Sequence, residues 1–218
     1  MSWALEDLLL FEPRVYWRLF ALENESVWPT QPVLLAAVAL LALCLIWGRR
    51  PSGRWLAPIV GAAWLWTGWQ FVALRYGTVN WAAPTLAWGF YVEAALLAGL
   101  GLSGRIVFMQ RERGAWFGLG LLAAALVWPV LAPLDGRPWR EAEVFAIAPD
   151  PTAIATLGLL ALAERSRWTA LLGIAPVLWL ALSTLTLVTL GAWQGWAVLA
   201  ALLAGLAAWA APFVRKPG

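Results

Sequence analysis

Histidine is absent from the 218 residues of this chain, and lysine occurs once, at Lys216 after the last apolar run. The absence of histidine excludes a Ser/His/Asp triad, a bis-histidine haem site and a histidine metal site. Because the single lysine lies outside every apolar run, a retinal Schiff base inside a helical bundle is excluded as well. A phosphate-binding glycine loop is also missing. We therefore predict no catalytic residue, no metal site and no cofactor, and an enzyme is the least supported class.

Cysteine and charge are almost as scarce. Cys44 is the only cysteine and lies within an apolar run, so no disulfide framework exists and we interpret it as a small buried hydrophobe. Charged residues make up 12% of the chain, with a formal net charge of +3. The arginines fall in short segments between apolar runs, which is typical of membrane orientation signals and does not indicate a nucleic-acid partner.

Apolar residues are what the chain has in excess. Hydrophobic residues account for 62% of the sequence, 18 tryptophans are present, and the mean hydropathy is +0.75. A soluble domain of this length could not bury so much apolar surface. The composition predicts an all-α fold, a polytopic transmembrane helical bundle whose main partner is the lipid bilayer.

The chain divides into an N-terminal segment, residues 1–31, and a bundle, residues 32–218. In the first segment Glu12 and Pro13 begin a helix with apolar residues at helical spacing, which predicts an amphipathic helix lying at the membrane interface. Seven apolar runs follow, and each is interpreted as a span: 32–47, 55–74, 82–102, 115–134, 144–163, 168–190 and 192–213.

Charge predicts the orientation. If the fifth run crosses the membrane, the segments 48–54, 103–114, 164–167 and 214–218 share one side and hold most of the Lys and Arg residues. If that run is re-entrant, the basic segments are split between the two sides. The positive-inside rule therefore favours seven spans with the N-terminus outside and the C-terminus inside.

The fifth run carries the first candidate site. Asp150 lies between Pro149 and Pro151, which predicts a helix N-cap at Asp150 with Pro151 at the first helical position. A helix of about a dozen residues would follow, too short to cross a bilayer alone, so we expect an interrupted or half-helical span. Thr152 and Thr156 share one face of it and extend a polar track inward. In the alternative interpretation, Asp150 caps a helix at the membrane surface and the threonines bond their own backbone.

Glu93 is the one ionisable residue well inside a span, about eleven residues from the start of the third run. A carboxyl group at that depth must face protein or water, or be protonated. It is therefore a candidate proton site, and a neutral glutamic acid bonded to a neighbouring helix is the alternative.

Polar residues near the second span suggest an entrance to this site. Gln70 ends a tryptophan-rich stretch and Asn80 follows it ten residues later, and we assign them with Asp150, Thr152, Thr156 and Glu93 to a ligand-, ion- or proton-binding set. An outward-facing vestibule is predicted from deep aromatic residues and from hydroxyls of the sixth span: Trp64, Trp66, Trp88, Trp179, Ser183, Thr184, Thr186 and Thr189. Helix packing by small polar residues is the alternative.

Several short motifs together resemble a bacterial membrane-protein family catalogued as domain of unknown function 6064. They are Trp28, Pro29 and Gln31, then Trp64, Leu65 and Trp66 with Gly68, then Asn80 with Ala82 and Ala83, and finally Pro149, Pro151 and Thr152 with Thr156 and Gly158. The resemblance implies a small multi-pass protein of the bacterial inner (cytoplasmic) membrane, with no established activity. Relatives can carry a cysteine where this chain has Asp150, so a soft-metal role does not carry over. An oxygen-ligand or proton site built from Asp150, Glu93 and the two threonines stays open.

Two hypotheses about function follow. The chain is a permease or channel for a small solute or ion, with a polar vestibule leading to Asp150 and Glu93. Alternatively, it is a structural or accessory subunit of a larger membrane complex and has no transport activity of its own. A membrane-protein partner or a homo-oligomer is expected in the second case.

Overall fold

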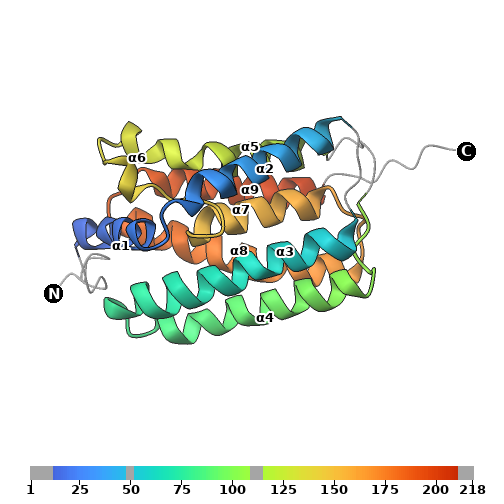
Figure 1. The fold of residues 1–218 in the computed structure, drawn as a ribbon, viewed down its shortest axis with the longest axis horizontal. Helices are drawn as coiled ribbons and strands as arrows, with labels where there is room; N and C mark the ends of the chain where they lie inside the picture. Colours follow the sequence, from blue (N-terminus) through green and yellow to red (C-terminus); the bar gives the residue numbers. More distant parts are fainter. Residues whose placement is uncertain (1–11, 48–51, 109–114, 211–218) are drawn as a thin grey trace, which may run out of the picture.

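The computed structural model describes residues 12–47, 52–108 and 115–210, and these form a bundle of helices (Figure 1). The α-helices are α1 (Pro13–Ser26), α2 (Thr30–Ile46), α3 (Gly53–Trp66), α4 (Ala83–Leu102), α5 (Ala115–Val127), α6 (Leu131–Leu134), α7 (Pro149–Ala161), α8 (Arg167–Thr189) and α9 (Gln194–Ala210). α3 continues into a π-helix, η2 (Thr67–Arg75), and three 3₁₀ turns are η3 (Tyr76–Thr78), η4 (Trp128–Val130) and η5 (Trp139–Glu141). Within these ranges no β-strand forms, so the predicted all-α class is confirmed.

Three helical segments are long and apolar enough to cross a membrane: Ala83–Leu102, Trp116–Leu134 and Arg167–Thr189. A fourth candidate arises if α1 and α2, which meet at an angle of 92°, count as one bent span. Membrane association is therefore supported by several helices. The seven spans and their orientation stay predictions, and the end of the last predicted span, like residues 1–11 of the N-terminal segment, lies outside the described residues.

Helix α7 lies in the middle of the bundle, and α5, α8 and α9 pack around it (Figure 1). Its residues from Pro149 to Leu160 are all buried, because neighbouring helices enclose it on every side. Its 13 residues agree with the short fifth helix that the sequence predicts. A helix enclosed in this way needs no amphipathic pattern, and its sequence shows none.

The predicted start of α7 is wrong by two positions. Ala148 is the N-cap and Pro149 occupies the first helical position, so Asp150 is the second helical residue. The fixed φ of Pro149 suits that first position, and Pro151 is tolerated in the same turn because the first N–H groups of a helix have no intrahelical partner. The Asp150 carboxyl group is thereby released from capping its own helix.

Glycine allows α7 to approach α5 closely. A Cβ atom added to Gly118 would lie 2.7 Å from the carbonyl oxygen of Gly158, and one added to Gly158 would lie 2.9 Å from that of Gly118. Distances below 3.0 Å are not tolerated by real Cβ atoms, so only glycine fits at this crossing. The contact fixes the depth at which α7 sits in the bundle.

Helix α1 packs against η2 and η5 at the end of the bundle where α7 begins. Its buried face includes Tyr16 and Phe20, and the ring of Phe20 stacks on Phe71 of η2 with the centroids 4.4 Å apart. An ion pair of 2.8 Å between Arg75 Nε and Glu23 Oε2 strengthens this contact. The predicted start of this helix at Pro13 is confirmed, and its position at a membrane interface stays a prediction.

Candidate functional site

Asp150 is held by two donors from α8. Trp179 donates its indole N–H to Oδ1 at 2.7 Å, and Ser183 donates its hydroxyl to Oδ2 at 2.6 Å. The two donors lie four residues apart and therefore share one helical face. The Asp150 side chain is 1% exposed, and Ala148 is the N-cap of α7, so the capping role that the alternative interpretation gave to Asp150 is wrong. Each carboxyl oxygen accepts one short hydrogen bond, which fixes the orientation of the group.

Two threonines, four residues apart, form a second polar face of α7 that is turned away from the face of Asp150. Thr152 donates its hydroxyl to the carbonyl of Ala148 at 2.7 Å and accepts the N–H of Ala146 at 2.9 Å. Thr156 donates to the carbonyl of Thr152 at 2.8 Å and accepts the indole N–H of Trp64 at 2.8 Å. The expected bonding of both threonines to their own backbone is confirmed, and each hydroxyl also ties α7 to another segment.

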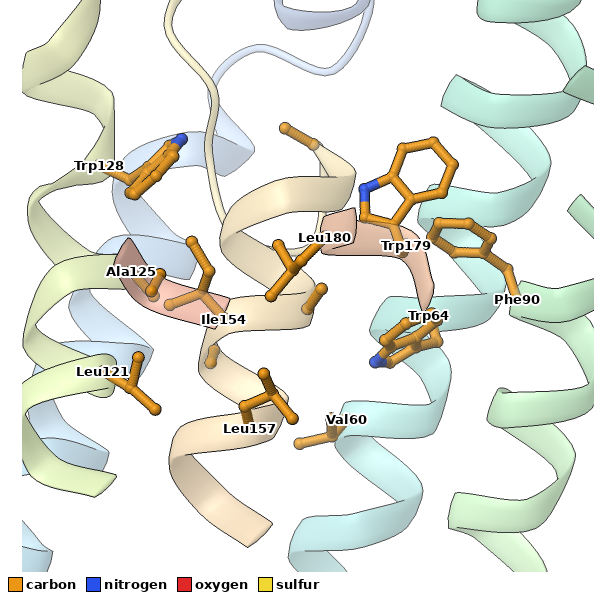
Figure 2. Close-up of a cluster of buried hydrophobic side chains, with 14 of the residues drawn as sticks. Val60, Trp64, Phe90, Leu121, Ala125, Trp128, Ile154, Leu157, Trp179 and Leu180 are labelled. Atoms are coloured by element: carbon orange, nitrogen blue, oxygen red, sulfur yellow. The ribbon is translucent and has the colours of Figure 1, made fainter. Parts of the chain in front are cut away.

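The tryptophans of the site meet across an aromatic contact. Figure 2 shows Trp179 and Trp64 beside Phe90 of α4. The centroid of the Phe90 ring lies 4.9 Å from that of Trp179 and 4.8 Å from that of Trp64. Edge-to-face and tilted aromatic pairs of this kind stabilise a fixed ring orientation. The indole N–H groups are therefore held in place for Asp150 and Thr156.

A second buried carboxyl group, that of Glu143, lies near Asp150. It is 3% exposed, and Oε2 accepts the indole N–H of Trp128 at 3.0 Å, whereas Oε1 has no hydrogen-bond partner in the structure. Burial raises the pKa of Glu143 well above its ordinary value, and the charge of Asp150 raises it further, while Arg137 and Trp128 act in the opposite direction. We call Glu143 and Asp150 the buried carboxyl pair.

Helix α1 brings a third polar residue to this pair. Tyr16, 4% exposed, lies within electrostatic reach of both Glu143 and Asp150. The phenol belongs to the helix that packs on the end of the bundle, so the pair is enclosed by α1, α7, α8 and the segment before α7. In the described part of the chain no group of three or more His, Cys, Asp and Glu residues gathers for a metal ion.

The other predicted site residues are not joined to this pair. Glu93 is 1% exposed in the middle of α4, and its Oε1 has no hydrogen-bond partner among the described residues. Phe90, one turn before Glu93 on α4, contacts the ring of Trp179, and Trp179 in turn donates to Asp150. Asn80 accepts the N–H of Ala82 at 3.0 Å and so forms a turn at the start of α4. Gln70 is half-buried in η2.

The predicted vestibule does not gather all of its residues. Trp64, Trp179 and Ser183 bond to side chains of α7, whereas Trp88 is 67% exposed on α4 and Trp66 is exposed as well. The hydroxyls of Thr186 and Thr189 are exposed and bond the carbonyls of Leu182 and Leu185 in their own helix. The period of a helix separates these residues onto different faces, which the sequence distance alone does not show.

Sequence reasoning missed Glu143 as a site residue, because it lies just before the predicted fifth span, which begins at residue 144. The signal that could have found it is the apolar stretch 144–147 directly after it, which indicates a segment entering the bundle. Ala146 within this stretch adopts a φ of 64°, and this left-handed residue turns the chain before α7.

The described residues form an all-helical bundle with polar side chains buried at its centre. Several of its helices are long and apolar enough to cross a membrane, which places the protein in the class of helical bundles suited to a membrane. The chain belongs to a family of unknown function, DUF6064, whose model matches residues 13–215 and confirms the resemblance noted from the motifs. No curated protein and no solved structure shows significant similarity to it.

Proposed function

We propose that this protein is a multi-pass permease or channel of the bacterial inner membrane that moves a proton or another small cation, and that the buried carboxyl pair binds it. The observation that supports the proposal is the burial of two carboxyl groups, those of Glu143 and Asp150, within electrostatic reach of each other. Neither is a partner in the ion pairs of the described residues, which join Arg75 to Glu23 and Arg137 to Asp135.

Electrostatics explains why such a pair calls for a cation. Two ionised carboxylates repel each other strongly where the dielectric constant is low, and burial penalises each charge separately. A shared proton or a bound monovalent cation removes the repulsion and lowers the burial cost, because a single negative charge is then left on the pair. The positive charge of Arg137 acts on Glu143, but the guanidinium of Arg137 is itself paired with Asp135 at 3.1 Å.

The surrounding residues receive roles in the same proposal. Trp179 and Ser183 fix the orientation of Asp150, and the hydroxyls of Thr152 and Thr156 extend polar atoms along α7 from Asp150 toward the bundle interior. Glu93 would be a second, separate protonation site. Asn80 and Gln70 would lie along the entrance. The topology proposed with this role has seven spans, N-terminus outside and C-terminus inside.

Ion flux into vesicles tests the proposal. The full chain is reconstituted in liposomes that enclose a pH-sensitive dye, and a potassium gradient with valinomycin sets the membrane potential; sodium and potassium fluxes are measured in parallel vesicles. Wild-type protein is expected to carry one of these ions faster than protein-free vesicles. Asp150→Asn and Glu143→Gln keep the shape of each side chain and are expected to return the flux to the protein-free level.

Glu164→Gln is the matched control, because Glu164 is an exposed carboxylate remote from α7's N-terminus, and its flux should equal that of the wild type. Each variant is first checked by size-exclusion chromatography for a monodisperse protein. If the wild type moves none of the three ions faster than empty vesicles, the transport proposal fails. An accessory subunit without transport activity then becomes the better interpretation.

A further inference from the structure

A pocket of about 500 Å³ opens between α1 and residues 136–141, apart from the buried carboxyl pair. Figure 1 shows α1 at the same end of the molecule as α6, the short helix that precedes this segment. Four arginines and two glutamates are among the residues that line it: Arg14, Arg18, Arg137, Arg140, Glu25 and Glu141. We call it the arginine pocket.

The two walls of the arginine pocket, α1 and residues 136–141, are joined by a cation–π contact and by hydrogen bonds. The guanidinium of Arg137 lies over the Trp17 ring, 3.6 Å from its centroid, and donates to the carbonyl of Glu141 at 3.2 Å. Asn24 of α1 donates its amide to the carbonyls of Arg140 and Ala142 at 2.9 and 2.8 Å. These contacts preform the pocket, because they join helix α1 to the opposite wall without any ligand.

The remaining arginines of the pocket form no ion pair with a described acidic residue. Arg14 and Arg18 lie one turn apart on α1, both exposed, and Arg140 lies exposed on the opposite wall. The ion pairs between described residues involve only Arg75 and Arg137. Three guanidinium groups without an ion-pair partner favour an anionic ligand. A guanidinium group can bind phosphate or carboxylate through two parallel hydrogen bonds.

The two glutamates narrow the choice of ligand. Glu25 and Glu141 line the same pocket, and neither takes part in an ion pair with a described residue. A pocket that presents unpaired groups of both signs suits a ligand with both charges, since a simple anion would be repelled by the carboxylates. The volume falls in the range of small-molecule sites.

We propose that the arginine pocket binds a phosphate ester that also carries an amine, with the arginines on the phosphate and the glutamates on the ammonium group. This chemistry is shared by free phosphoethanolamine and by the headgroup of phosphatidylethanolamine. The site is independent of ion transport through the bundle.

Calorimetric titration of the full chain in a lipid-free detergent tests the proposal, with phosphoethanolamine, inorganic phosphate and ethanolamine as probes. Phosphoethanolamine is expected to bind more tightly than either of the others. The double variant Arg14→Gln/Arg18→Gln and the single variant Arg140→Gln are each expected to weaken its binding by about tenfold or more, because each removes a charged hydrogen bond. Glu25→Gln should weaken the binding of phosphoethanolamine and strengthen the binding of inorganic phosphate, because it removes a carboxylate that attracts the ammonium group and repels a simple anion.

Arg54→Gln is the matched control, since Arg54 is an exposed arginine at the start of α3 and outside the pocket. It should bind as the wild type does. The proposal is overturned if phosphoethanolamine binds no better than phosphate or ethanolamine, or if the double variant binds like the control.

Nanodiscs distinguish the two sources of the ligand. If discs of phosphatidylethanolamine abolish the binding of free phosphoethanolamine and discs of phosphatidylglycerol do not, the pocket takes the lipid headgroup. If binding is the same in both kinds of disc, the pocket takes the soluble compound.

Discussion

Trp179 donates its indole N–H to Asp150 at 2.7 Å across the contact between α8 and α7. The bond joins a tryptophan from a long apolar helix to a carboxyl group buried in the centre of the bundle. Ser183 supplies the second donor from the same face of α8. The orientation of the Asp150 carboxyl group is therefore set by two donors on α8, and the loss of either donor should change the stability of the protein.

Replacement of Trp179 by phenylalanine should destabilise the protein by about 1–3 kcal/mol, because one buried oxygen of Asp150 loses its donor. Phenylalanine keeps an aromatic ring beside Phe90, so the packing loss is small. Chemical unfolding in detergent micelles measures the change in free energy. Trp66→Phe is the control, since Trp66 is exposed, and a change of equal size in both variants would contradict the role of the hydrogen bond.

Ser183→Ala should also destabilise the protein, by about 1–3 kcal/mol, since its hydroxyl serves the other oxygen of Asp150. The two donors act on one carboxyl group, so the double variant with Trp179→Phe should deviate from the sum of the single effects. A full double-mutant cycle measures the deviation. Strict additivity would show that the two bonds act independently.

Stability should fall as the pH rises, because burial raises the pKa of Glu143 in the folded protein above its value in the unfolded chain. Between those two values the folded state binds more protons than the unfolded state, so the free energy of unfolding decreases with increasing pH. Charges of Asp150 and Arg137 act on the same group in opposite directions. Thermal unfolding followed over a pH series measures the slope.

Glu143→Gln removes this titration and should flatten the slope, whereas Glu164→Gln, at an exposed position, should leave it unchanged. The glutamine variant should also be the more stable protein at the upper end of the pH series. Identical slopes in the wild type and Glu143→Gln would show that Glu143 does not titrate in this window.

Gly118→Ala should destabilise the bundle by about 1–3 kcal/mol, because the added methyl group would meet the carbonyl oxygen of Gly158 and push α5 from α7. Gly120→Ala, two residues further along α5, meets nothing within 4 Å and should be neutral or stabilising by up to about 1 kcal/mol. Chemical unfolding of both variants checks the difference. Equal effects would rule out the close approach at Gly118.

The sequence by itself determined the class of this protein and the position of its central helix. Its long continuous apolar runs favour helices, which satisfy their own backbone hydrogen bonds. The prolines at 149 and 151 mark the beginning of α7, and local steric rules place that beginning within two residues. The same local rules predict that Thr152 and Thr156 bond their own helix.

Only the tertiary structure decided which side chains meet at Asp150. Trp179, Ser183 and Trp64 come from helices distant in the sequence, and the rotation of each helix about its axis determines whether a residue faces α7 or the outside. That rotation separates Trp66 and Trp88 from Trp64 and leaves Glu93 apart from Asp150. The burial of Glu143 also depends on tertiary packing, because the segment before α7 enters the bundle beneath α1. Such contacts follow from the simultaneous packing of several helices, which no local pattern encodes.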